Sequence, residues 1–457
     1  MTQISAKRAW ITTTLFFVCM AFSYVDRQII SILVQPIKTT VGLNDTEIGL
    51  LQGLSFTLFY LIAGIPLSWL ADRVNRVRLA AGCIFVWSLA TTCTGLSRVF
   101  PMLVIARAGT AAAEAGFHPA ALSVVGDIFP ARHIPRATAL FMLGPIIGSG
   151  CALLLGGALL SWFSALAIGP LPIIGRLHAW QWVFVAVGVP GMLLAGLVLA
   201  MVKEPSRREL RATLDGNSTE PVSFSAACLF LLTRDRFYPL YFLGFAFFIL
   251  ATTAYAAWFP SVVIRKFLID PKTAGLVLGS TFLISGVLGN VFAQIYASRH
   301  VERAGALPVV MRVIVGSIAM MVPLAIVAPL LGNYVLAVVL YAPLVLLLST
   351  TQALFLVPLL LSVPNRMRGQ SIGIFALVIN AFGGTVGPLM TGVFSDGLGM
   401  GGAGTAIALA ITSGAGILGA LGLLYAASQS TLIIGSDLAD AAPALDIHPS
   451  LGDPKPG

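Results

Sequence analysis

The stretch VFPMLVIARAGTAAAEAGFHPAALSVVGD, residues 99–127, is long enough to cross a membrane, yet it carries Arg107, Glu114 and His118 inside an apolar run. A helix turns by about 100° per residue, so positions seven and eleven apart return to nearly the same face. The three side chains therefore form one polar stripe on one helix. An Arg or Asp near the middle of a bilayer costs about 2.5–3.5 kcal/mol on insertion scales, so such residues normally face a cavity or a partner.

The group that matches this stripe is Asp26-Arg27, in the segment SYVDRQIIS of the first apolar run. We expect the two helices to face each other across a transport site. The predicted substrate-binding and proton-coupling residues are Asp26, Arg27, Arg107, Glu114 and His118. The alternative is a structural ion pair that only locks the two helices together, with His118 hydrogen-bonded inside the bundle. Glu114 is the first candidate for the proton carrier and Asp26 the second, because moving a carboxyl group between a buried site and an arginine changes its proton affinity.

The composition places most of the chain in lipid. Of the 457 residues, 58% are hydrophobic and 10% are charged, whereas soluble domains carry about 25% charged residues. A net charge of +9 would suit nucleic acid in a soluble protein, but the basic residues here lie in short loops between apolar runs. Five cysteines without paired or metal-like spacing predict reduced, packed thiols. We therefore expect no nucleic acid, no metal and no cofactor.

Apolar runs of about 20 residues, the length that a bilayer core requires, occur twelve times. They predict an all-α integral membrane protein with twelve transmembrane helices in two pseudo-equivalent six-helix bundles. The runs are 10–34, 46–70, 79–97, 100–128, 136–163, 180–202, 237–264, 272–297, 308–330, 333–361, 369–395 and 402–427. The predicted domains are an N-terminal bundle at 1–202, a polar cytoplasmic linker at 203–236, a C-terminal bundle at 237–428 and a disordered cytoplasmic tail at 429–457.

Lysine and arginine in the loops predict the orientation. With the N-terminus inside, eighteen basic residues fall on the inner side and six on the outer side. This bias places both termini in the cytoplasm. Because the loops are short and no appended domain or sorting signal is visible, we expect the cell inner membrane.

Internal similarity predicts a duplicated half. Asp45–Arg78 and Pro271–Arg303 align at a constant offset of 226. The matched pairs are Gly49 with Gly275, Gly53 with Gly279, Ala71 with Ala297 and Arg73 with Arg299. Two six-helix halves of the same orientation are a known transporter plan, with the substrate site between them near the midplane.

The turn WLADRVNRVR, Trp69–Arg78, resembles the Asp-Arg loop motif of the major facilitator superfamily. The resemblance implies a cytoplasmic gate motif made of Asp72, Arg73 and Arg76. Asp72 is expected to hold the cytoplasmic side closed by bonding to a neighbouring helix end. The second copy carries Ser298 in place of the acid, so only the first half keeps this element.

Further motifs resemble the spinster subfamily of lipid transporters. They are Asp-Arg in the first helix, Arg-x6-Glu in the fourth, the segment GDIFPARHIPRATALF, and GPIIGSG at 144–150. A related branch, the organic anion and sugar-acid proton symporters, shares the same four charges. The resemblance therefore implies a transporter and leaves two substrate classes.

The two halves differ in a way that bears on the substrate. The second half has almost no ionisable residue at mid-membrane, and its first helix is rich in aromatic residues. A cavity with one charged and one apolar wall suits an amphiphile, whereas a sugar acid requires polar contacts from both halves. The residues that could supply such contacts are Tyr255, Gln294, Gln352 and Asn380.

The sequence predicts a proton-coupled secondary transporter that moves a lysophospholipid or sphingoid phosphate by alternating access. The alternative is an organic anion or sugar-acid:proton symporter. We expect a monomer whose partners are its amphiphilic substrate and membrane lipids, with protons as the coupling ion. An intramembrane enzyme is not expected, because no nucleophile-base or metal-ligand spacing is visible, and the duplicated halves favour a carrier over a channel.

Overall fold

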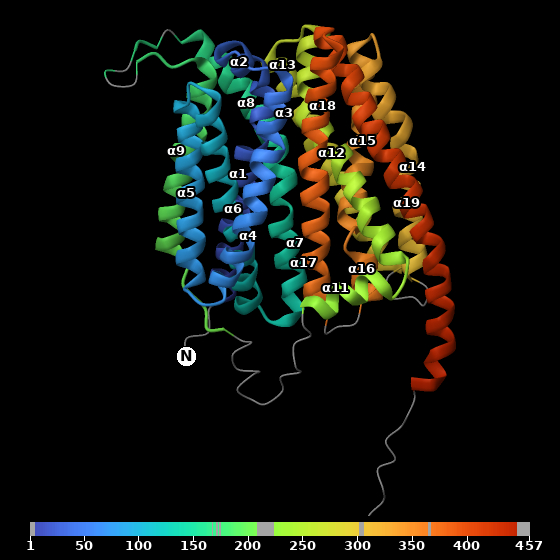
Figure 1. The fold of residues 1–457 in the computed structure, drawn as a ribbon. Helices are drawn as coiled ribbons and strands as arrows, with labels where there is room; N and C mark the ends of the chain where they lie inside the picture. The colour runs from blue at the N-terminus through green and yellow to red at the C-terminus, as the bar shows by residue number, and fades with distance from the viewer. Residues whose placement is uncertain are drawn as a thin grey trace, which may run out of the picture.

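The computed structural model describes residues 5–166, 168–170, 172, 175–207, 224–300, 306–363 and 367–445 (Figure 1). The first half contains α1 (Ala6–Gln28), α2 (Ile30–Val41), α3 (Asp45–Gln52), α4 (Leu54–Ala71), α5 (Arg76–Leu96), α6 (Phe100–Ile128), η1 (Ala131–His133), α7 (Ile134–Met142), α8 (Gly144–Ala165) and α9 (Ala179–Met201). The second half contains α11 (Phe224–Thr233), α12 (Phe237–Phe267), α13 (Pro271–His300), α14 (Ala306–Leu330), α15 (Tyr334–Leu354), α16 (Val357–Ser362), α17 (Arg368–Val378), η3 (Ile379–Gly384), α18 (Thr385–Leu398) and α19 (Gly401–Leu445).

Eleven helical segments within the described residues are long and apolar enough to cross a membrane. Helix α6 is the twelfth long helix, and it is the one that carries the predicted polar stripe. Several predicted spans are broken rather than continuous. The first breaks between α1 and α2, the second at Gly53, the fifth at Leu143, and the eleventh changes to the π-helical turn η3.

The two halves lie side by side in Figure 1, the first coloured blue to green and the second yellow to red. We call the end of the bundle that holds the start of α1 the N-terminal side, and the opposite end the distal side. On the distal side, α3 packs on α18, α8 packs on α13, and α2 packs on α12. The halves are therefore joined along their distal parts.

The glycines of the internal repeat make these contacts close. A Cβ atom at Gly49 would lie 2.6 Å from the carbonyl oxygen of Pro388, and one at Gly275 would lie 2.3 Å from that of Leu153. Gly49 belongs to α3 and Gly275 to α13, so equivalent positions of the two repeats form the two equivalent contacts across the seam. Small residues allow helices to approach this closely in membranes.

Replacing Gly275 with Ala is expected to destabilise the protein by about 1–3 kcal/mol, because the added methyl group meets main-chain atoms that cannot move aside. Thermal unfolding of the purified protein measures the effect. Gly316→Ala is the matched control, since a Cβ atom at that helical glycine meets nothing within 4 Å. Equal unfolding temperatures for the two variants would contradict the close contact.

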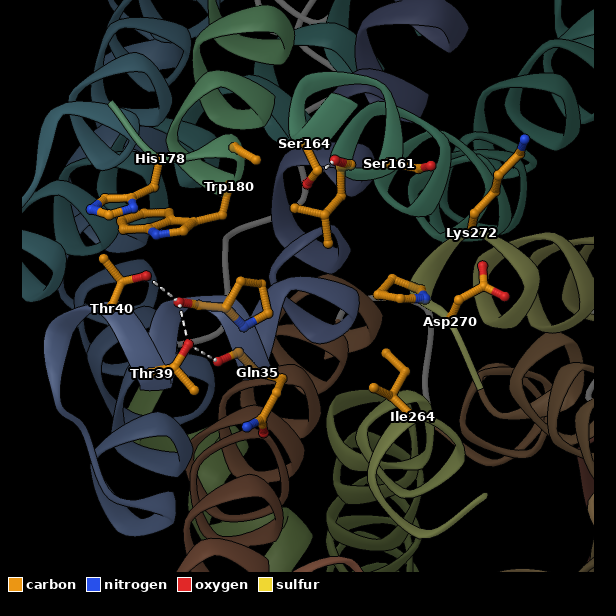
Figure 2. A pocket seen from close by; sticks show the side chains of 14 residues that line it. Gln35, Thr39, Thr40, Ser161, Ser164, His178, Trp180, Ile264, Asp270 and Lys272 are labelled. Atoms are coloured by element: carbon orange, nitrogen blue, oxygen red, sulfur yellow. Dashed lines mark hydrogen bonds between the residues drawn. The ribbon is translucent and has the colours of Figure 1, made fainter. Parts of the chain in front are cut away.

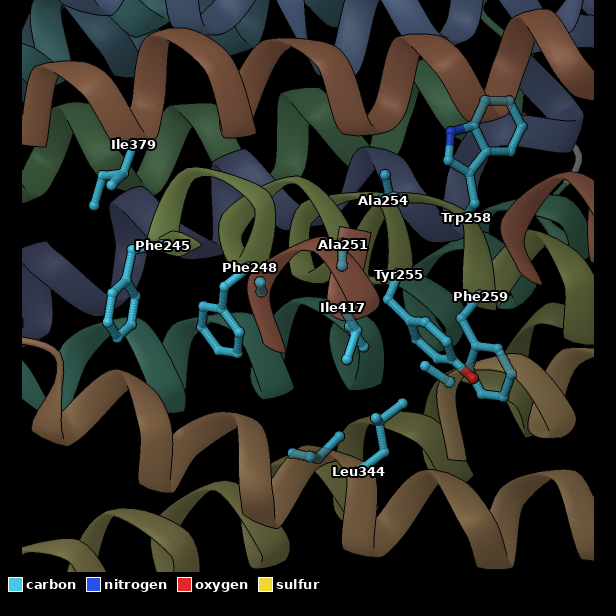
Figure 3. Close-up of a cluster of buried hydrophobic side chains, with 14 of the residues drawn as sticks. Phe245, Phe248, Ala251, Ala254, Tyr255, Trp258, Phe259, Leu344, Ile379 and Ile417 are labelled. Atoms are coloured by element: carbon cyan, nitrogen blue, oxygen red, sulfur yellow. The ribbon is translucent and has the colours of Figure 1, made fainter. Parts of the chain in front are cut away.

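The aromatic residues of α12 pack into the core of the second half rather than forming a cavity wall. Figure 3 shows Phe245, Phe248, Tyr255, Trp258 and Phe259 among other buried apolar side chains. The Tyr255 and Phe259 rings stack with their centroids 4.8 Å apart. The expected apolar wall of aromatic side chains is therefore absent from the cavity face of α12.

The predicted linker and tail differ from the structure in part. Helix α11 (Phe224–Thr233) forms inside the predicted loop, because its sequence FSAACLFLLT is apolar. Helix α19 continues to Leu445, past the predicted end of the bundle at 428, so the predicted disorder does not apply to 429–445. Residues 208–223 of the linker and 446–457 of the tail lie outside the described residues.

Candidate functional site

Arg107 holds the break in the first span. Its Nη1 atom donates to the carbonyl of Asp26 at 3.1 Å, and its Nη2 atom donates to that of Arg27 at 2.7 Å. The Arg107 side chain is buried, and main-chain carbonyls accept from both Nη atoms, while Nε has no hydrogen-bond partner among the described residues. The predicted contact between the first and fourth spans is present, but it is made to the backbone and not to the carboxylate of Asp26.

Replacing Arg107 with Lys is expected to cost about 1.5–3 kcal/mol, the range for a hydrogen bond to a charged group. A lysine ammonium is a point donor and does not reproduce the fork that reaches both carbonyls. Thermal unfolding measures the loss, and Arg136→Lys, at an exposed position, is the control. An unchanged unfolding temperature for Arg107→Lys would show that the fork is dispensable.

Asp26 and Glu114 are both buried and incompletely hydrogen-bonded. The Thr91 hydroxyl donates to Asp26 Oδ2 at 3.1 Å, and the Ser23 side chain hydrogen-bonds to Glu114. Asp26 Oδ1 and Glu114 Oε1 have no hydrogen-bond partner among the described residues. Glu114 lies within electrostatic range of Arg27 and Arg107, although none of the ion pairs found in the described part of the chain joins these groups.

Arg27 is the predicted residue that lines both a small cavity beside Glu114 and a larger cavity between the halves. Its guanidinium carbon lies 4.3 Å from the centre of the Phe56 ring, a cation–π contact. The guanidinium of Arg107 lies 4.9 Å from the same ring. Phe56 thus contacts both cations without neutralising them, and of the two only Arg27 lines these cavities.

A small cavity of about 30 Å³ lies beside Glu114. It is lined by Met20, Ser23, Tyr24, Arg27, Tyr60, Glu114, Phe117 and His118. A volume of about 10–15 Å³ is enough for one water molecule when polar partners are present. The structure therefore brings Arg27, Glu114 and His118 to one small cavity within the first half, whereas Asp26 and Arg107 lie outside its lining.

A larger cavity of about 250 Å³ lies between the halves. Its polar lining from the first half is Tyr24, Arg27, Gln28 and Ser149, and from the second half Thr252, Thr253, Tyr341, Ser349, Gln352 and Asn380. Its apolar lining includes Ile146, Leu153, Ile249, Phe282 and Leu348. Polar side chains thus face the cavity from both halves.

Part of this lining was predicted from the sequence. Gln352 and Asn380 were expected to offer polar contacts and do line the cavity, whereas Tyr255 is buried in the core and Gln294 is not among the lining residues. Tyr24 and Gln28 were missed. Their signal was their spacing, since they lie one helical turn apart and flank Asp26-Arg27.

The π-helical turn η3 places Asn380 in this cavity. Asn380 Nδ2 donates to the carbonyl of Ala376 at 2.8 Å, and the Thr253 hydroxyl of α12 donates to that of Gly383 at 3.1 Å. Single π-helical turns inside α-helices occur frequently at functional sites. Asn380 of this turn and Thr252 and Thr253 of α12 line the same cavity.

The predicted gate motif anchors the start of the linker to the first half. Arg76 is buried and donates to Asp127 at 2.5 Å and to Glu204 at 2.8 Å. Arg73 lies 3.8 Å above the Trp69 ring. Arg207 donates to the main-chain carbonyls of Ala71, Asp72 and Val74 and so caps the end of α4.

The Asp72 side chain itself is exposed. Its expected bond to a neighbouring helix end is not among the hydrogen bonds of the described residues, and its role as a latch stays a prediction.

A second charged cluster, which sequence reasoning missed, joins the halves on the distal side. Arg265 of α12 donates from Nη1 to both carboxylate oxygens of Asp45 at 2.9 Å and from Nε to Gln35 at 2.8 Å. Lys38 and Ser395 also contact the Asp45 carboxylate, at 2.6 and 2.7 Å. Both side chains of the Asp45–Arg265 pair are buried, with 6% and 8% exposure.

A second carboxylate, that of Asp396 of α18, caps the start of α3. Its carboxylate accepts from the amide groups of Asp45 and Thr46 at 2.9 and 2.7 Å, and from the Thr46 hydroxyl at 2.7 Å. Negative charge is favourable at a helix N-terminus. Four chain segments of the two halves are therefore tied together at one place.

Beside this cluster, a pocket of about 630 Å³ opens at the seam of the distal side. Figure 2 shows side chains from both halves around it, including Gln35, Thr39 and Thr40 of α2 and Ile264 of α12. The hydroxyls of Thr39 and Thr40 donate to carbonyls of their own helix. Gln35 is shared between the pocket lining and the hydrogen bond to Arg265.

Comparisons with known proteins agree with this architecture. Residues 16–388 match the sequence profile of the Major Facilitator Superfamily. The chain is 28% identical over 397 residues to the "MFS-type efflux pump" of Mycolicibacterium smegmatis, covering 86% of each protein. It is 29% identical over 306 residues to the "Probable L-galactonate transporter" of Escherichia coli, covering 63% of this chain and 62% of that protein.

Among solved structures, the chain is similar to a bacterial homolog of the human lysosomal transporter Spinster, in an inward-facing and unoccupied conformation. The TM-score is 0.74 and the identity 22%, with 96% of this chain and 99% of that chain covered. The predicted likeness to the spinster branch is confirmed in fold, and it extends to sequence, since the chain is 25% identical over 302 residues to "Protein spinster homolog 1" of Xenopus laevis, covering 63% of this chain and 54% of that protein.

Two six-helix halves around a central cavity, in a multi-pass membrane protein, define a secondary transporter. The chain belongs to the Major Facilitator Superfamily. The predicted family and twelve-helix fold are confirmed, and membership identifies the chain as a transporter rather than an enzyme.

Proposed function

We propose that the protein is a proton-coupled symporter of a small polyhydroxylated organic anion. The observation that carries this proposal is the central cavity, where Arg27 offers a positive charge and both halves offer hydroxyl and amide groups. A carboxylate would bind Arg27, and substrate hydroxyls would bind Asn380, Gln352 and their neighbours. Buried polar groups of this kind discriminate strongly, because a ligand that lacks the matching group leaves them unpaired.

The halves alternate access to this cavity. Their distal parts are packed together through Gly49 and Gly275, which corresponds to a state closed on the distal side. The bias of basic residues toward the loops of the N-terminal side supports cytoplasmic termini. We place the protein in the cell inner membrane as a monomer, with the closed distal side external and with surrounding lipids and substrate as its partners.

Protons supply the driving force through Glu114, with Asp26 as the second carboxyl group. Burying an unpaired charge is costly, and Glu114 Oε1 lies buried without a hydrogen-bond partner among the described residues. Protonation removes that charge, and the small cavity beside Glu114 provides a place for water that delivers the proton. Arg27 lines both cavities and therefore connects the proton site to the substrate site.

A lysophospholipid or sphingoid phosphate is the second candidate substrate. The observation in its favour is the apolar part of the same cavity, which includes Ile146, Leu153, Phe282 and Leu348. An acyl chain requires a continuous apolar path, however, and the aromatic residues of α12 that were expected to form it are buried in the core. The organic anion therefore fits the lining better.

Thermal unfolding of the purified protein with added ligands tests the proposal, since a ligand that binds the folded state raises its apparent stability by mass action. L-galactonate is expected to raise the unfolding temperature of the wild type, and Arg27→Gln is expected to remove the effect. Arg312→Gln, at an exposed position of α14, is the control. A response to a lysophospholipid without any response to L-galactonate would overturn the substrate class.

A further inference from the structure

Pro260 frees one main-chain carbonyl in α12. A proline has no amide hydrogen, so the carbonyl four residues earlier loses its bond within the helix. Helix α12 runs through Pro260 to Phe267, and the residue four positions earlier is Ala256. Both Ala256 and Pro260 line the central cavity. The cavity therefore contains a carbonyl that needs a donor from elsewhere.

Gln28 supplies that donor from the other half. Its Nε2 atom donates to the carbonyl of Ala256 at 2.7 Å. The same nitrogen contacts the Ser31 hydroxyl at 3.1 Å, and that hydroxyl donates to the carbonyl of Gln28 at 2.8 Å. Gln28 is the last residue of α1, so the break that Arg107 holds also aims this amide across the seam.

We propose that Gln28 senses the substrate: its amide binds the carbonyl of Ala256 while the cavity is empty, and a hydroxyl of the bound substrate takes over that carbonyl. Binding then replaces a hydrogen bond between the halves with one between substrate and α12. The inference rests on the proposed substrate class, because only a ligand with a hydroxyl donor makes the exchange.

The exchange is energetically accessible. A buried carbonyl left without any donor is costly, whereas a change of donor leaves the number of hydrogen bonds unchanged. Arg27 directly precedes Gln28 and lines the same cavity, so an anion held by Arg27 brings its hydroxyl groups near the Ala256 carbonyl. The substrate shifts the balance between the two states only by its differential affinity for them. The bond from Gln28 to Ala256 forms in only one of the two states. Its replacement by the substrate therefore gives the substrate different affinities for them.

The first test needs no substrate. Ser149→Cys places a reporter thiol in the cavity, and its labelling by a membrane-impermeant maleimide is measured from the distal side, with the protein lacking this cysteine as the baseline. Gln28→Met removes the amide donor at nearly constant shape. Pro260→Ala restores the missing N–H, so that the helix itself satisfies the carbonyl of Ala256.

Each substitution is expected to raise the labelling rate by about two- to tenfold, the change that corresponds to one net hydrogen bond. Because both act on one bond, the double variant is expected to label no faster than the faster single variant. Gln294→Met, at an exposed position of α13, is expected to leave the rate unchanged. Rates that multiply in the double variant, or an unchanged rate in Gln28→Met, would overturn the link between Gln28 and Ala256.

The second test adds L-galactonate, or hexanoate as its six-carbon analogue without hydroxyls. L-galactonate is expected to raise reporter labelling in the wild type and to have no further effect in Gln28→Met, while hexanoate has none in either. Failure of L-galactonate to bind the wild type in the thermal assay refutes the proposed substrate class. Binding without a change in labelling refutes the sensing role alone. If Gln28→Met folds poorly, Gln28→Asn, whose amide is one methylene too short, is measured in its place with the same expectation.

Discussion

Replacing Glu114 with Gln is expected to abolish the dependence of uptake on a proton gradient. Glutamine keeps the shape and the hydrogen bond to Ser23 but has no carboxyl group that can take up and release a proton. Exchange of substrate across the membrane at equal pH is expected to persist, since it requires only that the loaded protein change state. Proteoliposomes loaded with L-galactonate and assayed with and without a pH gradient measure both activities in one preparation.

The control for this prediction is Glu114→Asp, which retains a carboxyl group in the same cavity and is expected to keep gradient-driven uptake at a reduced rate. Asp26→Asn in the same assay distinguishes the roles of the two carboxyl groups. Gradient-driven uptake that survives in Glu114→Gln but disappears in Asp26→Asn would show that Asp26, and not Glu114, carries the coupled proton. Loss of exchange in Glu114→Gln would instead point to a role in binding.

The sequence predicts the polar side of the site because helical periodicity is strict. Arg107, Glu114 and His118 lie on one face of α6, whatever the rest of the molecule does. The break in the first span was not predicted, because Gln28 and Ile29 carry no glycine or proline signal. As a result, Arg107 bonds to a pair of main-chain carbonyls rather than forming the structural ion pair that was considered as the alternative.

The substrate-facing side of α12 illustrates a different limit. Counting its aromatic residues suggested an apolar wall, yet the side chains toward the cavity are Ile249, Thr252, Thr253, Ala256 and Pro260, which recur with helical spacing. The aromatic residues occupy the other faces and pack in the core. Periodicity, rather than composition, carried the information about this wall, and it indicates a mixed surface with two threonines and no aromatic side chain.

Contacts between the halves could not be predicted from the sequence, because no local pattern of residues specifies them. Asp45 and Arg265 are 220 positions apart, and Arg265 read alone is an ordinary basic residue at a helix end. The repeat did identify the glycines that each contact the opposite half at the seam, since duplication leaves a visible offset. It could not identify a bond that joins one copy to a helix of the other half.

Removing either partner of the Asp45–Arg265 pair is expected to open the distal side, because breaking a buried ion pair from one side costs about 3–5 kcal/mol. The substitutions are Asp45→Asn and Arg265→Met, and the readout is labelling of the Ser149→Cys reporter from the distal side. Lys266→Met is the matched control. Lys266 is the neighbour of Arg265 but donates to the carbonyls of Pro329 and Leu331 within its own half.

The two substitutions are expected to differ in size for a physical reason. Arg265→Met leaves Asp45 with Lys38 and Ser395 as partners, whereas Asp45→Asn leaves the Arg265 guanidinium buried with only neutral partners among its described contacts. Asp45→Asn is therefore expected to raise the labelling rate more, and the double variant to fall short of the product of the single effects, because the second change removes a charge that the first left unpaired. Equal single effects that multiply in the double variant, or an effect in Lys266→Met as large as in Arg265→Met, would show that this pair does not hold the distal side closed.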